Sequence, residues 1–478
     1  MRNQINCRHA LLYAGCLLFL GSCSKESLCL RDPNAPGCEL LVSFGALPAH
    51  SLIAKEVDTQ FAVQISKRPD GQHESSYPIW FVDPVSAGSG VRVGEATYLR
   101  ESDERGGLYV AVVGKNNPQL QVRQRYAIRV GIPGSETVPD APTKTQPTVA
   151  VVKRPIRYQA PTVLAQKMQA QTEYPQLRLL GMVGNALVGA GGGADVFGKQ
   201  GQRLKVFPWV ETNFSSGQAG SLLSTTFEPR VSMATSGSQV LLGIPESVLW
   251  AKCGLDAKTL TGCVVNKTLP VPNEMQQVAS SGDGKWIAYV GSHGSVQVGE
   301  FGGSGWMTLG GPSVSGTVNK GLWFADVNGD GREDVVAAWQ GSELEVKAYL
   351  ALASGMAFAE DVRWSKAMGT VGSGAVSAMA VGDLDTDGYA DVVVAKGLTI
   401  EAYQSVAGEI GEVGKMVKVW SQELDKAQAG PEVQSLTIGR LGGGDASVSP
   451  DVMAATYSEC PSAGSVCDVY LYAFRAMN

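Results

Sequence analysis

Apolar residues in this chain occur in short runs separated by Gly, Pro, Asp, Asn and Ser, and no long segment repeats its apolar positions with the 3.6-residue period of a helix. Short runs rich in Val, Ile, Tyr and Phe, bounded by turn residues, are typical of β-strands. A length of 478 residues exceeds the usual size of one domain. The pattern therefore predicts an all-β protein with two domains.

The segment 39–132 alternates strand-like runs with turns. The runs are "ELLVSF", "TQFAVQIS", "PIWFVD", "EATYLR", "GLYVAVVG" and "QRYAIRVGI". Six or seven short strands at this spacing are typical of a β-sandwich of about 100 residues. Because the segment lacks the Cys…Trp…Cys pattern of antibody domains, it predicts an Ig-like β-sandwich in architecture only. The next segment, 133–148, is proline-rich and poor in apolar residues, which predicts a semi-extended linker.

From residue 149 to 478 the chain repeats a unit of an apolar run, a Gly/Asp-rich turn and a second apolar run. The six units begin at "LRLLGMVGNALVGAGG", "RVSMATSGSQVLLGIP", "QQVASSGDGKWIAYVG", "LWFADVNGDGREDVVAAW", "AMAVGDLDTDGYADVVVAKG" and "LTIGRLGGGDASVSPDVMAAT". A period of about 45–57 residues is that of four-stranded β-propeller blades. The segment therefore predicts a six- or seven-bladed β-propeller. A seventh unit would pair "TVAVVKRPIRY" with the C-terminal "DVYLYAF" and leave no open edge.

Two of these units share an acidic loop, "DVNGDGRED" and, 57 residues later, "DLDTDGYAD". Oxygen-bearing side chains at loop positions 1, 3, 5 and 9 and the main-chain carbonyl of position 7 can surround one cation, and Gly at position 6 permits the tight curl. Clustered carboxylates repel one another, and Ca²⁺ relieves this with less demanding geometry than Mg²⁺. The predicted ligands of two Ca²⁺ ions are Asp326, Asn328, Asp330, Arg332 and Asp334 in the first loop, and Asp383, Asp385, Asp387, Tyr389 and Asp391 in the second.

Other interpretations of the acidic loops fit less well. An EF-hand requires Glu at position 12 and flanking helices, whereas Ala337 and Val394 occupy that position and the flanks are β-rich. Solvated Asp-Gly hairpin turns would explain one such loop better than two with every ligand position filled. The loops resemble the FG-GAP repeats of integrin α-subunit propellers and the related VCBS-type repeats of bacterial surface proteins. The resemblance is specific over 321–400 and implies a calcium-binding β-propeller.

Two further turns depart from this pattern. In the last unit Arg440 stands where the first Asp is expected, and because a guanidinium cannot ligate a cation, we expect no metal there. The turn around Asp283 resembles that of Tol-type periplasmic propellers, and Asp283 is expected to cap its own turn.

The N-terminus has the pattern of an export signal. Arg2 and Arg8 precede a short apolar run that ends in "LGSC", so residues 1–22 are predicted to be a signal peptide. The ending resembles the lipobox of bacterial lipoproteins, which implies a lipid on Cys23 and a tether over 23–38. An ordinary signal peptide or a short membrane anchor is the alternative. Ser24 after the cysteine implies outer-membrane sorting, on either the periplasmic face or the cell surface.

Cysteine spacing is consistent with export. Six of the nine cysteines remain beyond Cys23 and form three pairs that are close in sequence, a pattern typical of disulfides in an oxidising compartment. The predicted pairs are Cys29 with Cys38, Cys253 with Cys263, and Cys460 with Cys467.

Charge and motifs narrow the function. The net charge is −6 and no basic tract is present, which argues against nucleic acid as a partner. No common catalytic motif occurs, and His293 is the one histidine in the propeller segment. We expect a non-enzymatic, lipid-anchored envelope protein whose calcium-stabilised propeller binds a protein or glycan. A propeller enzyme acting on polysaccharide or phosphoester, or an envelope-assembly scaffold, is the alternative.

Overall fold

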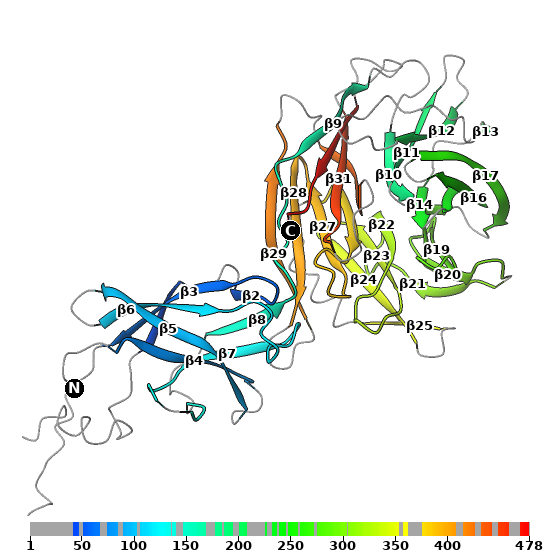
Figure 1. The fold of residues 1–478 in the computed structure, drawn as a ribbon. Coiled ribbons are helices and arrows are strands. Elements are labelled where there is room, and N and C mark those ends of the chain that lie inside the picture. The colour runs from blue at the N-terminus through cyan, green and yellow to red at the C-terminus, as the bar shows by residue number, and fades with distance from the viewer. Residues whose placement is uncertain are drawn as a thin grey trace, which may run out of the picture. The chain divides into compact units, whose positions relative to one another are not determined.

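A computed structural model places the chain in two compact units, one formed by residues up to 121 with 125–151, and one formed by 122–124 with 152–478 (Figure 1). The structure describes residues 42–46, 51–66, 74–84, 89–102, 106–134, 136–139, 147–168, 177–183, 186–194, 200–207, 225–226, 232–236, 239–244, 247–256, 259–271, 275–303, 305–352, 357–361, 375–407, 414–425, 432–441, 448–457 and 469–477. Every regular element in these ranges is a β-strand, which confirms the all-β prediction. None of these residues lies in a helix long and apolar enough to cross a membrane.

The N-terminal unit is one eight-stranded sheet with the strand order β1-β3-β6-β5-β4-β7-β8-β2. Its strands are β1 (Val42–Ala46), β2 (Leu52–Ala54), β3 (Thr59–Ser66), β4 (Ser76–Val82), β5 (Gly90–Ser102), β6 (Gly106–Val113), β7 (Arg125–Val130) and β8 (Thr148–Val152).

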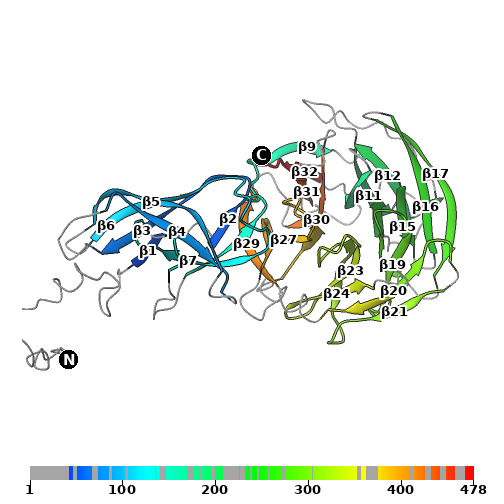
Figure 2. The same cartoon turned by 60° about the horizontal axis from the view of Figure 1, so that its bottom comes forward.

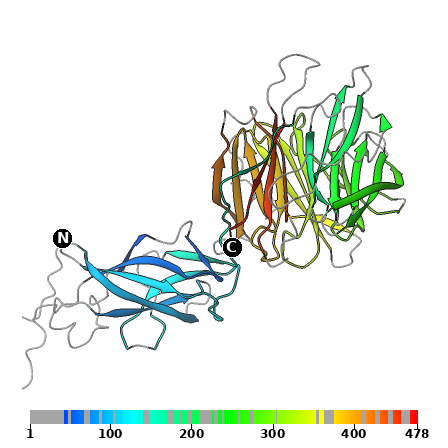
Figure 3. The same cartoon turned by 45° about the horizontal axis from the view of Figure 1, so that its top comes forward.

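One core serves the whole of this sheet. Ile53 of β2, at one end of the strand order, shares the core with Val63 of β3 near the other end, and Phe44 of β1 packs against it. A sheet whose two ends face the same core must curl on itself, as Figure 3 shows for this unit. The two separate sheets of an Ig-like sandwich are not seen in the described residues, and the N-terminal domain is a single curled sheet instead.

The division between the units falls after Val151, later than the linker expected at 133–148. Thr148–Ala150 pair with β7, and Val149 and Val151 are fully buried in the N-terminal core, so this segment completes the first unit instead of opening the second. Within the expected linker, Glu136 bonds to Arg92 of β5. The apolar, β-branched composition of "TVAVV" therefore indicated a strand correctly but not its partner.

The second unit contains five blades of four consecutive antiparallel strands, matching the four-stranded repeat expected from the period. They are blade 1, β10 (Leu177–Val183), β11 (Ala186–Ala194), β12 (Gln200–Phe207) and β13 (Thr225–Thr226); blade 2, β14 (Ser232–Ser236), β15 (Gln239–Ile244), β16 (Ser247–Asp256) and β17 (Thr259–Pro270); blade 3, β18 (Met275–Ser280), β19 (Trp286–Gly291), β20 (Val296–Glu300) and β21 (Met307–Gly310); blade 4, β22 (Val318–Ala325), β23 (Asp334–Gln340), β24 (Leu344–Ala351) and β25 (Phe358–Glu360); and blade 5, β26 (Ala378–Gly382), β27 (Asp391–Lys396), β28 (Thr399–Val406) and β29 (Lys415–Glu423).

A composite sheet closes the ring. It consists of β30 (Val433–Gly439), β31 (Asp451–Tyr457), β32 (Val469–Phe474) and β9 (Thr162–Met168). The first strand of each sheet packs against the first strand of the next, and β30 of this closing sheet packs against both β26 and β10, which completes the circle seen in Figure 2.

The blade count differs from the expected six or seven repeated blades, because five are continuous in sequence and the closing sheet joins the two ends of the unit. The expected closing strand was also wrong. "TVAVV" pairs in the N-terminal unit, and β9 pairs with β32 instead. The end of "TVAVVKRPIRY" does meet the C-terminus, through the isolated bridge between Tyr158 and Ala476.

The second strands of blades 4 and 5 have uninterrupted apolar interiors because both of their faces are covered. In β27 "DVVVAK", Val392 and Val394 face the core shared with blade 4, whereas Val393 and Ala395 face the core shared with the closing sheet. A strand packed on both faces has no solvent side on which to place polar residues. The acids of these two strands, Asp334 and Asp391, therefore lie at the strand ends, where the acidic loops join them.

Candidate metal centre

The two acidic loops occupy equivalent places in neighbouring blades. Each connects the first strand of its blade to the second, β22 to β23 in blade 4 and β26 to β27 in blade 5. The ninth loop residue, Asp334 or Asp391, is the first residue of the second strand, so the end of the loop is fixed by the sheet. The loops touch: the Ala390 N–H donates to the Asp326 main-chain carbonyl at 2.7 Å.

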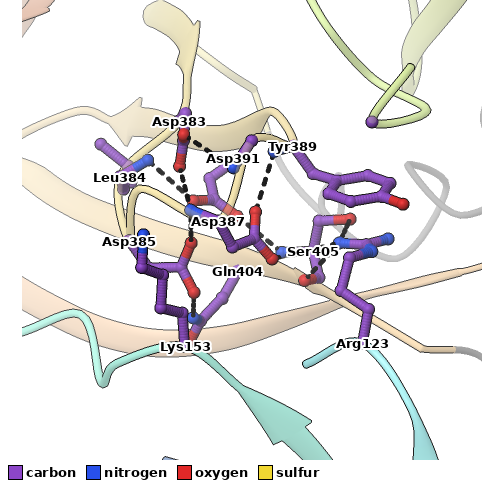
Figure 4. A network of polar contacts seen from close by, with 12 residues as sticks. Arg123, Lys153, Asp383, Leu384, Asp385, Asp387, Tyr389, Asp391, Gln404 and Ser405 are labelled. Carbon is purple, nitrogen blue, oxygen red and sulfur yellow. Dashed lines mark hydrogen bonds and ion pairs between the residues drawn. The ribbon is translucent and has the colours of Figure 1, made fainter. Parts of the chain in front are cut away.

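The blade 5 loop gathers its carboxylates closely (Figure 4). One oxygen from each of Asp383, Asp385 and Asp391 lies within 4.8 Å of the others, and within the described part of the chain this is the one acidic group found with that geometry. The main-chain N–H groups of Asp387 and Gly388 donate to the two Asp383 oxygens, at 3.1 and 2.9 Å. The backbone thus wraps around the carboxylate of position 1 and directs the others to the same side.

Left-handed backbone at positions 4 and 6 produces this wrapping. Position 6 is Gly331 in blade 4 and Gly388 in blade 5, with φ of 80° and 91°. Glycine adopts such angles without the steric cost that a Cβ imposes. Position 4 is Gly329 in blade 4, with φ 75°, but Thr386 in blade 5, with φ 61°.

The carboxylate of position 9 holds each loop to its blade. Asp391 accepts hydrogen bonds from the Leu384 and Ser405 N–H groups, at 2.9 and 2.8 Å. In blade 4, Asp334 accepts the equivalent bonds from the Val327 and Ala351 N–H groups, at 3.0 and 2.7 Å. The acid therefore ties the loop to the third strand of its own blade.

Burial makes these carboxylates costly to ionise. Desolvation raises the pKa of Asp334 to about 7, and the nearby charges of Asp326 and Asp330 add to the shift. Desolvation likewise raises the pKa values of Asp383, Asp387 and Asp391, and in Asp385 it acts with the charges of Asp387 and Asp383. A buried group of carboxylates with raised pKa values is the donor set that a divalent cation neutralises. The residues fit an oxygen-ligated cation.

The blade 4 loop is more open. Asp326 accepts N–H bonds from Gly329 at 2.6 Å and Gly331 at 2.7 Å, as its counterpart does in blade 5. Position 3 is the neutral Asn328, whose side-chain amide donates to Asp330 at 3.1 Å. The Arg332 guanidinium also pairs with the Asp330 carboxylate, whose side chain remains 27% exposed. One predicted ligand is therefore already balanced by a cationic side chain.

The residues at position 7 were predicted for their carbonyl oxygens, and the structure shows additional contacts of the Tyr389 side chain. Its ring lies so close to Gly329 that a Cβ there would come within 2.0 Å of it. The Arg123 guanidinium stacks on the same ring, 3.6 Å from the ring centre, and lies 3.7 Å from the Asp387 carboxylate. Tyr389 thus fills the space between the two loops.

The closing sheet repeats the support of position 9 without the other acids. Asp451 accepts N–H bonds from Leu441 at 3.2 Å and Ala476 at 3.0 Å, matching Asp334 and Asp391. Here the Arg475 guanidinium pairs with the Asp451 carboxylate at 2.8 Å. Arg440, expected to displace a metal, donates to the Val448 carbonyl at 3.0 Å. In this sheet a cationic side chain provides the counter-charge.

Asp283 caps its turn in blade 3, which confirms the role expected for it. Its carboxylate accepts hydrogen bonds from the Ser281 hydroxyl at 2.6 Å and the Lys285 N–H at 2.9 Å. These bonds lower the pKa of Asp283. His293 lies exposed in the turn between β19 and β20, as expected of a loop histidine, whereas His50 and His73 lie outside the described residues.

Several residues around the blade 5 loop were not found from the sequence. The Gln404 amide, fully buried, donates to the Asp385 carboxylate at 2.6 Å and to the Arg154 carbonyl at 3.1 Å. The Lys153 ammonium bonds to the Thr386 carbonyl. A lone Gln in the buried strand "TIEAYQSV" was the available signal for Gln404, whereas Arg123 and Lys153 are distant in sequence and carried none.

Both residues of one predicted cysteine pair lie in strands whose backbone the structure describes. Cys253 of β16 and Cys263 of β17 are directly opposite in the strand register. Cross-strand neighbours have Cα separations within the range a disulfide spans, so this disulfide remains a prediction with favourable register. Cys23, Cys29, Cys38, Cys460 and Cys467 lie outside the described residues, as do the predicted signal peptide and tether.

Comparison with known proteins supports the class that the loops indicate. Residues 326–394, which span both acidic loops, match the FG-GAP-like repeat family. The chain therefore contains a β-propeller with FG-GAP-like repeats in blades 4 and 5.

Solved structures match only at low similarity. A protein of unknown function from Bacteroides thetaiotaomicron has a TM-score of 0.40 and 10% identity, covering 92% of this chain and 99% of its own. Sqt1 of Chaetomium thermophilum, solved with the N-terminus of ribosomal protein L10, has a TM-score of 0.34 and 12% identity over 61% and 72% of the two chains. The WD40 repeats of RRP9 give 0.36 and 14%, over 67% and 100%. At these scores none bears on function. A search of curated protein sequences gives no match.

Proposed function

We propose that this chain is an exported, lipid-anchored envelope protein whose β-propeller holds two Ca²⁺ ions as structural elements and binds a protein or glycan partner. The observation that carries the calcium part is the meeting of Asp383, Asp385 and Asp391 oxygens within 4.8 Å. The FG-GAP-like match over both loops supports the same assignment. The binding role rests on the absence of a common catalytic motif in the sequence.

Calcium would act by neutralising the loop carboxylates. Asp383, Asp385, Asp387 and Asp391, with the Tyr389 carbonyl, would hold one ion in blade 5. Asp326, Asn328, Asp330 and Asp334, with the Arg332 carbonyl, would hold the other in blade 4. Bound Ca²⁺ supplies positive charge among oxygens that otherwise repel one another. Since the two loops are joined by the Ala390–Asp326 hydrogen bond, the ions would fasten neighbouring blades together.

Thermal unfolding tests the calcium assignment. Calcium should raise the melting temperature of the purified protein, because an ion that binds only the folded state stabilises it by about 2.7 kcal/mol at 100 times its dissociation constant. A chelator should reverse the shift. An equal melting temperature with calcium and with chelator would reject structural calcium.

Membrane fractionation tests the anchor. The wild-type protein should be recovered with membranes and should incorporate labelled fatty acid, whereas Cys23→Ser should be neither labelled nor retained. Labelling that persists in C23S would place the lipid elsewhere. Export should also leave Cys253 and Cys263 inaccessible to thiol reagents until the protein is reduced.

A binding screen tests the partner class. The purified protein, with and without calcium, would be applied to a glycan array and to solubilised envelope proteins. Saturable binding of a defined glycan or protein supports the binding role. Turnover of a polysaccharide or phosphoester in the same preparation would instead support the enzyme alternative.

A further inference from the structure

The two acidic loops differ most in what surrounds position 3. In blade 5 this residue is the acidic Asp385, which is 1% exposed. In blade 4 it is the neutral, partly exposed Asn328. A carboxylate that is shielded from water needs a hydrogen-bond donor to fix its orientation, whereas an amide in contact with water does not.

Gln404 provides that donor. Its side-chain amide donates to one Asp385 oxygen at 2.6 Å, while the other Asp385 oxygen accepts the Asp387 N–H at 3.1 Å (Figure 4). The same amide donates to the Arg154 carbonyl, so its orientation is fixed from two sides. Gln404 is fully buried, and its own side-chain oxygen has no hydrogen-bond partner in the structure.

The register-equivalent position of blade 4 does not carry an amide. Strand register aligns Tyr403 with Tyr349, since each pairs with the residue that follows the acid of position 9. The next residue is Gln404 in blade 5 and Leu350 in blade 4, and Leu350 packs against apolar neighbours. Position 3 and its support therefore change together, from Asp with Gln to Asn with Leu.

We propose that Gln404 is a positioning residue for the metal site of blade 5, and that it makes this loop the tighter of the two calcium sites. The inference rests on the proposed calcium function. Two features of the loops support the order of affinity. Blade 5 offers four carboxylates, one of them 3.7 Å from Arg123, whereas blade 4 offers three, one of them paired with Arg332. Ligand charge and rigidity are the properties that set calcium affinity.

The proposal is tested by calcium titration calorimetry on the purified, chelator-treated protein. The wild type should show two classes of site. Gln404→Met, which removes the donor at similar volume, should weaken the tighter site by roughly 10–100-fold, as is usual for residues that orient a ligand. The matched control is Leu350→Met in blade 4, which should change neither site appreciably. If Q404M fails to fold, Gln404→Asn, whose shorter amide cannot reach Asp385, replaces it.

Two further measurements distinguish a positioning role of Gln404 from a purely structural one. Terbium luminescence lifetimes in H₂O and D₂O count metal-bound waters, and Q404M should increase that count at the tighter site because Asp385 no longer faces the ion. In an Asp385→Asn background, Gln404→Met should have little additional effect on affinity, since the carboxylate it positions is gone.

The outcomes separate this inference from the proposed function. If the wild type binds no calcium, the calcium function fails. If it binds calcium but Q404M leaves the tighter site and its hydration unchanged, or weakens it equally in the D385N background, Gln404 does not position a ligand. If Q404M weakens only the looser site, the assignment of the tighter site to blade 5 is wrong.

Discussion

Gly329 of the blade 4 loop lies against the Tyr389 ring of the blade 5 loop. A Cβ at this position would lie 2.0 Å from the Tyr389 ring, and the backbone φ is also positive. Gly331, two residues on, has a similar φ of 80° but no atom within 4 Å of a built Cβ. Comparing substitutions at Gly329 and Gly331 therefore separates the free-energy cost of a left-handed backbone from that of a steric clash.

Replacing each glycine by alanine should give different losses of stability. Gly331→Ala should cost about 1–2 kcal/mol for left-handed backbone, and Gly329→Ala should cost about 1–3 kcal/mol more for overpacking. Thermal unfolding in chelator measures both without a metal contribution. Tyr389→Ala should remove most of the additional loss in the G329A protein. Equal losses for the two alanine variants would show that Tyr389 yields without cost.

Glu401 forms a second charged cluster in blade 5, away from the acidic loop. It is 8% exposed and accepts hydrogen bonds from Tyr403 at 2.7 Å and Lys418 at 3.1 Å, and it pairs with Lys396 at 2.9 Å. Burial opposes ionisation of this group, but these three partners outweigh it and lower the pKa of Glu401.

The sign of this shift predicts the pH dependence of stability. A carboxyl whose folded pKa is depressed contributes stability above its unfolded pKa, near 4.3, and loses it as pH falls through the folded value. Glu401→Gln should therefore cost about 1–3 kcal/mol at pH 7, and the difference from wild type should shrink below about pH 4.3. Melting temperatures across this range measure it. A constant difference down to pH 3 would contradict a charge-based contribution.

At the scale of elements, the loop that joins the first two strands of a blade is held in the same way in three sheets, with different counter-charges. Asp334, Asp391 and Asp451 each accept one N–H from their loop and a second one, which comes from the third strand for Asp334 and Asp391 and from Ala476, just after the third strand, for Asp451. In the closing sheet Arg475 pairs with the acid directly. This pair should stabilise its loop whether or not calcium is present.

A double-mutant cycle tests that independence. Arg475→Met and Asp451→Asn, alone and together, should give a coupling energy of about 0.5–3 kcal/mol, because either single change removes the ion pair between the two side chains. The coupling should be the same in calcium and in chelator. A coupling near zero, or one that appears only in chelator, would contradict the role of Arg475 as a fixed counter-charge.

The acidic loops were predictable from sequence, whereas their surroundings were only partly so. The positions from Asp383 to Asp391 are local, and a nine-residue loop has few ways to curl around a left-handed Gly388. Gln404 and Arg475 act through contacts 19 and 24 residues away in sequence, which only strand register determines. Apolar alternation likewise indicates that a strand exists but not which strand pairs with it.

At the scale of the whole molecule, this limit explains the difference at ring closure. "TVAVV" and β9 both have strand-like composition, and their positions in the chain do not distinguish them as partners of β32. The structure distinguishes them. Val149 and Val151 are buried in the N-terminal core, whereas β9 pairs with β32 in the closing sheet. Within the second unit, β9 from its start and β32 from its end are adjacent strands of the closing sheet.

A ring closed in this way should depend on its last strand. Deleting residues 469–478 removes β32 and leaves β31 and β9 without their shared partner, so the edges of two strands become unpaired. The truncated protein should melt at a lower temperature and lose amide-exchange protection in β9, β30 and β31. A shorter deletion of residues 477–478 leaves β32 intact and should retain most of that protection. Unchanged protection after the longer deletion would show that the propeller stays folded without the β32 strand that closes its ring.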